Sequence, residues 1–184
     1  MRIALMAVAT VVFLTACGTA PEPKTTAPPA QSTAKQAVAN LASASGSLVS
    51  GKVTLTPMGD GVHLTGTVGG LPANSTHGFH VHEKGDCSAA DASSAGGHFN
   101  PFILPHGKAG TGSHHAGDMD NVVANAEGVV NLDIHVGGVT LGGGASNDIA
   151  GRALVVHAAP DDYTSQPAGN AGARVACGVI KVTQ

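Results

Sequence analysis

The chain has 184 residues, of which only 11% are charged and 3% are aromatic, and its formal net charge is −3 at pH 7. A nucleic-acid-binding domain ordinarily carries a basic surface and aromatic side chains that stack on bases. This composition has neither, so we expect no nucleic-acid partner. The 26 glycines instead favour a domain of short strands joined by tight turns.

The first sixteen residues combine one basic residue, Arg2, with a short apolar run. Such a segment is typical of a secretory signal peptide and is too short to span a bilayer stably. Residues 14–17, LTAC, resemble a bacterial lipobox, which predicts that Cys17 is acylated and holds the mature protein at a membrane surface. The alternative is an ordinary signal peptide with a chance cysteine. Because Gly18 rather than an acidic residue follows, we predict a lipid-anchored protein on the periplasmic side of the bacterial envelope, with the outer membrane favoured.

Residues 17–46 consist mainly of Ala, Pro, Thr, Ser and Gln, with almost no large apolar side chains. Such a segment cannot bury enough surface to offset the entropy of ordering it, so we predict a flexible tether. The chain then divides into a signal peptide (1–16), a lipidated Cys17 with its tether (17–46) and one domain (47–184). The length of this domain is sufficient for a core of its own.

Apolar and polar residues alternate in several short runs of this domain, which is the pattern of half-buried strands. Between the first two runs, residues 58–61 contain an Asp-Gly pair that favours a hairpin turn. The expected strands are 48–57, 62–68, 77–83, 121–124, 129–136, 153–158 and 174–182. Strands this short and this numerous predict an all-β fold, an antiparallel Greek-key β-sandwich or flattened eight-stranded barrel with long metal-binding loops.

Six of the ten histidines lie between Gly78 and Asp118. Neutral imidazole is a common ligand of zinc and copper, so this density predicts a metal site. His80 and His82 are two residues apart in an apolar, β-type run, and both rings therefore leave the same face of a strand. Two imidazoles on one face make half of a tetragonal nitrogen site, the type that suits copper(II). The loop-like segment that follows supplies residues that satisfy a closed tetrahedral zinc site: His98, His106, His115 and Asp118.

Five short segments stand in a fixed order along the domain: GFHVHE at 78–83, GGHFNP at 96–101, HAGD at 115–118, GRALVVHA at 151–158 and GNAGARVACGVI at 169–180. From Ser47 to the C-terminus, this pattern resembles the copper/zinc superoxide dismutases, particularly their bacterial periplasmic branch. The resemblance implies an enzyme that converts superoxide, its small-molecule substrate, to dioxygen and hydrogen peroxide with copper and zinc as cofactors. The chain departs from the family in loop lengths, with eleven positions from Cys87 to His98 and a short segment 161–170.

The resemblance also implies a role for each site residue. It implies two ligand sets, copper on His80, His82, His98 and His157, and zinc on His98, His106, His115 and Asp118. His98 would bridge the two metals. Asp161 would accept hydrogen bonds from one copper histidine and one zinc histidine, which fixes ligand orientation. Arg174 would attract and orient the anionic substrate through its permanent charge.

With Cys17 assigned to the anchor, Cys87 and Cys177 remain as a pair in an oxidising compartment, and we predict a disulfide between them. The alternative, two free thiols that bind zinc, lacks the CxxC spacing of such sites. The remaining histidines are excluded from the metal site. His63, His77 and His135 are interpreted as packing or surface residues, and His114, next to His115, as a residue that binds metal transiently or not at all.

Two other functions fit parts of the pattern. One is a non-catalytic periplasmic copper/zinc-binding protein on the same scaffold, which a missing copper ligand or a missing arginine would favour; neither is missing. The other is an adhesion-type sandwich with incidental histidines, which a metal-free purified protein would favour. The sequence leaves the oligomeric state open, a homodimer included.

Overall fold

The computed structural model describes residues 30–184, which form nine β-strands and one short 3-10 helix. In chain order the elements are β1 (Ala37–Ser43), β2 (Ser50–Met58), β3 (Gly61–Gly69), β4 (Thr76–His77), β5 (Phe79–His82), η1 (Ser93–Ala95), β6 (Val122–Val123), β7 (Val130–Gly137), β8 (Ala153–His157) and β9 (Arg174–Val182). The predicted strand 77–83 is divided, because His77 pairs with Val122 in β6 while Phe79 pairs with Val156 in β8.

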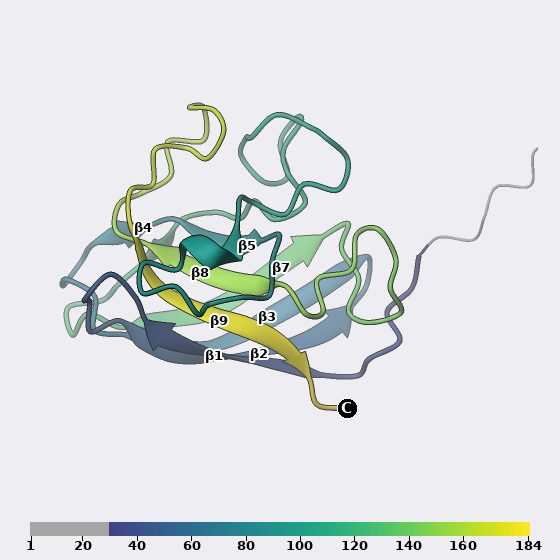
Figure 1. The fold of residues 1–184 in the computed structure, drawn as a ribbon, viewed down its shortest axis with the longest axis horizontal. Coiled ribbons are helices and arrows are strands. Elements are labelled where there is room, and N and C mark those ends of the chain that lie inside the picture. The colour runs from purple at the N-terminus through teal and green to yellow at the C-terminus, as the bar shows by residue number, and fades with distance from the viewer. Residues whose placement is uncertain (1–29) are drawn as a thin grey trace, which may run out of the picture.

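Seven strands make one sheet in the order β5-β8-β9-β1-β2-β3-β7, and β4 pairs with β6 in a second, two-stranded sheet. Every pair is antiparallel. The large sheet curls so that β5 and β8 lie above the plane of β1, β2 and β3 (Figure 1). Strands far apart in the sequence, such as β1 and β9, are neighbours in the sheet. The all-β antiparallel fold predicted from the alternating pattern is therefore confirmed.

The core fills the inside of the curl with the apolar residues of this alternating pattern. Val53 and Leu55 of β2 and Leu64 of β3 are fully buried, whereas the neighbouring Thr56 and Thr65 are exposed. Period-two burial of this kind is the reason these segments adopt strands, since each strand hides one face and hydrates the other. The rigid sheet then gives the site fixed positions on β5, β8 and β9.

Strand β1 contradicts the prediction of a tether that runs to residue 46. Ala37–Ser43 lies in the middle of the sheet, between β2 and β9, and Ala37, Ala39 and Leu41 are buried. These small residues alternate correctly for a strand, but alanine contributes so little apolar area that composition alone indicated disorder. The chain is already attached at Ser32, whose hydroxyl accepts a hydrogen bond from the Leu141 N–H at 2.9 Å. The folded domain therefore begins before Ser47.

The predicted signal peptide and the predicted lipidation of Cys17 lie outside the described residues and stay predictions. Within residues 30–184, no helix has the length and apolar character needed to cross a membrane.

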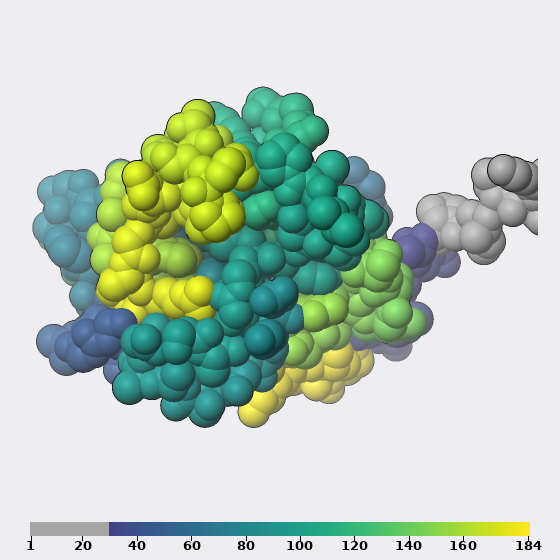
Figure 2. Space-filling view, turned by 45° about the horizontal axis from the view of Figure 1, so that its top comes forward, coloured from purple at the N-terminus to yellow at the C-terminus, as the bar shows by residue number. Residues whose placement is uncertain are grey.

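Two extended connections rise from the same side of the sheet (Figure 1). We name residues 83–121 the long loop and residues 158–173 the short loop. The long loop is joined to β9 by a disulfide between Cys87 and Cys177, whose Cα atoms are 5.7 Å apart. The predicted disulfide is therefore confirmed. In the space-filling view, the teal residues of the long loop and the yellow-green residues of the short loop gather on the same face (Figure 2).

Candidate metal centre

Four imidazoles meet where β5 and β8 lie beneath the long loop. His80 and His82 come from β5, and His157 ends the adjacent strand β8. His98 comes from the long loop, which pairs briefly with β5 through a bridge between His82 and His98. All four residues are buried. Two of these side chains share one face of β5 because of their spacing, as the sequence predicted.

We name these four residues the copper group, after the metal that the sequence analysis predicts for them. Their ring nitrogens converge closely. One ligand atom from each of His80, His82, His98 and His157 lies within 4.8 Å of the others. The Nε2 atoms of His82 and His157 face each other at 3.3 Å, and the ring centroid of His98 is 4.0 Å from that of His80. Four imidazole nitrogens in one small space form the donor set that suits copper.

The second group, which we name the zinc group after its predicted metal, consists of His98, His106, His115 and Asp118. It is built around one carboxylate in the long loop. The Oδ1 atom of Asp118 lies 2.8 Å from His98 Nδ1, 3.0 Å from His106 Nδ1 and 3.3 Å from His115 Nδ1. Its Oδ2 atom accepts hydrogen bonds from the backbone N–H groups of His115 at 2.8 Å and Gly107 at 3.2 Å. The backbone thus turns the carboxylate so that Oδ1 faces the three nitrogens. Three imidazoles and a carboxylate match a closed zinc site.

Several ring nitrogens in the two groups are buried without a hydrogen-bond partner: His80 Nδ1, His98 Nε2, His106 Nδ1 and His115 Nδ1. A buried polar atom with no partner costs free energy, so it ordinarily indicates a ligand that fills the place of the partner. Each of these atoms belongs to a residue of the two metal-type clusters among the described residues. The residues present therefore fit copper in the first group and zinc in the second.

Asp161, in the short loop, connects the two groups. Its Oδ2 atom accepts a hydrogen bond from His80 Nε2 at 2.8 Å, and its Oδ1 atom accepts one from His106 Nε2 at 3.0 Å. Because both rings donate through Nε2, their Nδ1 atoms are left as lone-pair donors toward the metal positions. His82 uses the opposite arrangement, since its Nδ1 atom donates to the Gly96 carbonyl at 2.9 Å and its Nε2 atom faces the copper group. The sequence prediction for Asp161 thus agrees with its contacts.

Burial also sets the protonation of the ligands. It lowers the pKa of His80 to about 4, that of His157 to about 3 and that of His82 to about 2. For Asp118, burial raises the pKa, but hydrogen bonds from His98 and from two backbone N–H groups outweigh it and hold the pKa well below its usual range. At neutral pH these residues are neutral imidazoles and a carboxylate, which are the forms that bind metals.

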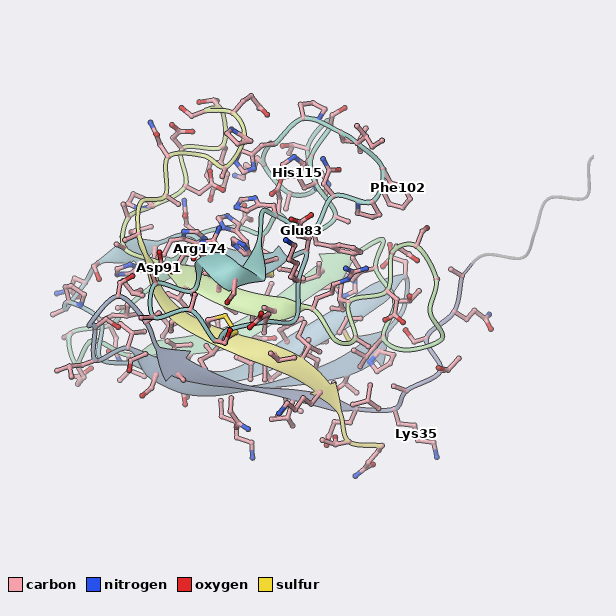
Figure 3. All side chains as sticks on the ribbon, in the orientation of Figure 1. Lys35, Glu83, Asp91, Phe102, His115 and Arg174 are labelled. Carbon is pink, nitrogen blue, oxygen red and sulfur yellow. A yellow bond between two sulfur atoms is a disulfide. The ribbon has the colours of Figure 1, made fainter. Side chains whose placement is uncertain are left out.

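Arg174 opens β9 and stands opposite His157 in the β8–β9 register. Its guanidinium donates hydrogen bonds of 2.6 Å to the carbonyls of Ala92 and Gly96, both in the long loop. Burial lowers the pKa of Arg174 and the nearby charge of Asp91 opposes this, but the group stays charged at neutral pH. The two residues are labelled next to each other in Figure 3, and their charges act on each other. A fixed positive charge therefore stands beside the copper group.

The other histidines lie outside both groups. His77 is buried and donates through Nδ1 to the His157 carbonyl at 2.7 Å, so it packs behind the copper group. His63 and His135 pair with Asp133 and Asp60 at 3.0 and 2.9 Å on the sheet surface. His114 donates through Nδ1 to the adjacent His115 carbonyl at 2.8 Å. None of these four rings belongs to either group, and their exclusion from the metal site stays a prediction.

Two amides near the site were not predicted. Asn121 donates through Nδ2 to the Asp161 carbonyl and accepts from the Asp161 N–H, both at 2.8 Å. Gln166 makes the same kind of reciprocal pair with the backbone of His106, at 2.9 Å in both directions. The partners are 40 and 60 positions apart in sequence, and amides are common in loops, so no local pattern could have indicated them.

Comparison with known proteins identifies the family of the chain. Residues 49–180 match the family model of copper/zinc superoxide dismutase (SODC). The chain belongs to the copper/zinc superoxide dismutase family. It is therefore an oxidoreductase that acts on superoxide with copper and zinc as cofactors, and the resemblance noted in the sequence is confirmed.

Individual relatives agree. Superoxide dismutase [Cu-Zn] 2 of Aquifex aeolicus is 42% identical over 149 residues, which cover 79% of this chain and 86% of the relative. Superoxide dismutase [Cu-Zn] 1 of the same organism is 45% identical over 134 residues, which cover 71% and 79%.

Solved structures share the fold but differ in what they are named for. The crystal structure of the clock protein EA4 has a TM-score of 0.73 and 38% identity and covers 85% of this chain and 100% of its own. A SOD-like protein from Bacillus subtilis, solved as a double mutant, has a TM-score of 0.71 and 35% identity, with coverages of 78% and 96%. Because these names differ, the specific function is argued from the site residues.

Proposed function

We propose that superoxide is disproportionated at the copper group, with the ring of His98 shared between copper on His80, His82 and His157 and zinc on His106, His115 and Asp118. The position of His98 carries this proposal. Its Nδ1 atom faces Asp118 at 2.8 Å, and its Nε2 atom is buried without a partner beside His80. One ring therefore presents a nitrogen to each donor set.

The division of work follows from the contacts of each residue. Copper, when bound, would alternate between two oxidation states, so that one superoxide is oxidised to dioxygen and a second is reduced, with two protons, to hydrogen peroxide. The Nε2 atom of His98 is the place on the protein where one of these protons can be held and returned. Arg174 draws the anion to the copper group through its positive charge, which opposes the repulsion expected from the net charge of −3 of the whole chain.

The zinc group is expected to act through position rather than through redox chemistry, because zinc has one accessible oxidation state. Binding there would fix the long loop, which carries His98 and the carbonyls of Ala92 and Gly96 that hold Arg174. Zinc would thus stabilise both the shared ring and the substrate-attracting charge.

Metal analysis combined with an activity assay tests the proposal. We expect one copper and one zinc per chain and rapid superoxide loss in the loaded protein. His82→Gln should lower copper content and activity together, whereas His135→Gln, an exposed histidine that pairs with Asp60 and belongs to neither group, should change neither. A fully loaded protein without activity would favour the non-catalytic metal-binding function, and a protein that binds neither metal would refute both.

We also propose that the enzyme protects the cell envelope from superoxide while anchored by acyl chains on Cys17. The LTAC segment after a short apolar run supports this proposal. Cys17→Ser should prevent lipid labelling and release the protein from the membrane fraction. Retention of Cys17→Ser in that fraction would contradict the anchor without affecting the assignment of the metal groups.

A further inference from the structure

His106 lies in a part of the long loop with few buried residues and no regular secondary structure. Among residues 102–113, only His106 and Gly107 are buried, and no strand or helix includes them. The residues immediately before them are exposed, with Ile103 91% accessible to solvent and in a left-handed conformation. A zinc ligand on such a segment must be held by contacts from elsewhere, because a loop without packing samples many conformations.

The short loop supplies those contacts through the side chain of Gln166. Its Nε2 atom donates to the His106 carbonyl at 2.9 Å, and its Oε1 atom accepts from the His106 N–H at 2.9 Å. Both polar groups of the His106 backbone are therefore satisfied by one amide, in the manner of a rung between two β-strands. Such a pair fixes the position and the rotation of the peptide, and with them the direction of the imidazole.

The imidazole itself is held by a carboxylate at one nitrogen, Nε2, while Nδ1 has no hydrogen-bond partner. Its Nδ1 atom faces Asp118 at 3.0 Å and its Nε2 atom donates to Asp161 at 3.0 Å. Gly169 covers the second contact, since a Cβ atom at this position would collide with Asp161 Oδ1 and lie 2.7 Å from His106 Nε2. The turn that presents Gln166 is closed by a hydrogen bond from the Gly169 N–H to the Ser165 carbonyl at 2.7 Å. Backbone and ring of His106 are thus held by the same short loop.

We propose that Gln166 is a positioning residue for the zinc group, and that its amide sets the zinc affinity by fixing the backbone of His106. This inference rests on the proposed role of His106 as a zinc ligand. Residues that orient metal ligands typically change metal affinity by about 10–100-fold when they are replaced. Since Gln166 acts on the backbone rather than on the ring, we expect the lower end of this range, about tenfold.

Three variants isolate the contribution of the amide. Gln166→Leu keeps the approximate size of the side chain but removes both hydrogen bonds. Gln166→Glu keeps an acceptor for the His106 N–H but loses the donor to its carbonyl, so it should restore part of the effect. Asn147→Leu is the matched control, because Asn147 Nδ2 also donates to a backbone carbonyl, that of Gly138 at 2.8 Å, in a loop that carries no metal ligand.

Zinc affinity is measured by competition with a chromophoric chelator, and the geometry of the zinc group by the visible spectrum of the cobalt-substituted protein. We expect Gln166→Leu to bind zinc about tenfold more weakly and to alter the cobalt spectrum, Gln166→Glu to lie between it and the parent, and Asn147→Leu to match the parent in both. Unchanged affinity and spectrum in Gln166→Leu would overturn the inference, even if its metal-free form melted earlier.

Different results would refute the proposed function itself. If the parent protein bound no zinc, or if His106→Ala bound zinc as tightly as the parent, the ligand assignment itself would be wrong. If Gln166→Leu did not fold, the Gln166→Glu result decides, since an affinity and spectrum equal to those of the parent would still contradict the inference.

Discussion

Acid should destabilise the metal-free enzyme strongly between pH 7 and pH 5. The cause is the burial of three imidazoles, His80, His82 and His157, whose pKa values in the folded state fall to about 4, about 2 and about 3. In the unfolded chain a histidine has a pKa near 6.5. A group whose pKa is lowered by folding contributes its stabilisation above the unfolded pKa, and that contribution is lost as the pH falls below it.

The magnitude follows from these values. At pH 5, about 1.5 units below the pKa of an unfolded histidine, protonation stabilises the unfolded chain by about 2 kcal/mol for each such residue. Each buried histidine stays neutral in the folded protein because its pKa lies lower still. The three residues together lower the free energy of unfolding by up to about 6 kcal/mol between pH 7 and pH 5. This loss is comparable to the whole stability of a small domain. His106 opposes the trend, since burial is outweighed by the hydrogen bond to Asp161 and the charge of Asp118, which raise its pKa.

Urea unfolding of the chelator-treated protein at pH 7 and pH 5 measures this loss directly. His82→Leu should retain the fold. Its free energy of unfolding should fall by about 2 kcal/mol less between pH 7 and pH 5 than that of the parent, because one buried titratable ring is removed. The copper- and zinc-loaded protein should keep its stability to lower pH, since metals compete with protons for the same nitrogens. Equal stability of the metal-free protein at both pH values would refute the reasoning.

Three further predictions concern the surroundings of the copper group. Arg174→Glu should leave metal content unchanged and slow capture of superoxide about tenfold at low salt, since a charge at about 6 Å in water changes the energy by about 0.7 kcal/mol and reversal doubles it; lower copper content would contradict this role. Asp91→Asn should raise the rate about twofold at low ionic strength, and the gain should vanish in about 1 M salt; stopped-flow assays at both salt concentrations measure it. Replacing Cys87 and Cys177 by Ala opens a link that spans 90 positions and should cost roughly 4–5 kcal/mol of unfolding free energy in urea; a loss under about 1 kcal/mol would contradict the chain-entropy argument.

The strands with clear alternation could be predicted because burial on one face imposes a period of two. The hairpin between β2 and β3 and the last strand, β9, follow the expected ranges closely. Strand β1 escaped detection because its buried positions are mostly alanine, and its place between β2 and β9 depends on partners far away in the sequence. Tertiary pairing supplied what local composition did not.

The site residues show the same division. His80 and His82 could be predicted from spacing on one strand, because strand geometry is local. The bridging role of His98 and the roles of His157 and Asp161 came from the resemblance to a family, since their convergence depends on the fold as a whole. Gln166 and Asn121 were beyond both routes, because each acts through the backbone of a residue in another loop. Every residue except proline offers the same backbone N–H and C=O groups, so the identity of a residue does not show which side chain binds its backbone.

The two metal groups therefore differ in the origin of their rigidity. Three of the four copper-group rings stand on paired strands, so the sheet holds them before any metal binds. The zinc group lies wholly in the long loop, and His106 is held there by Gln166 and Asp161 of the short loop. Because His98 belongs to both groups and Asp161 contacts one ring in each, loosening of the zinc group should reach the copper group through this shared ring and this carboxylate. The contacts between the two loops are therefore expected to affect catalysis through the positions of the metal-binding side chains.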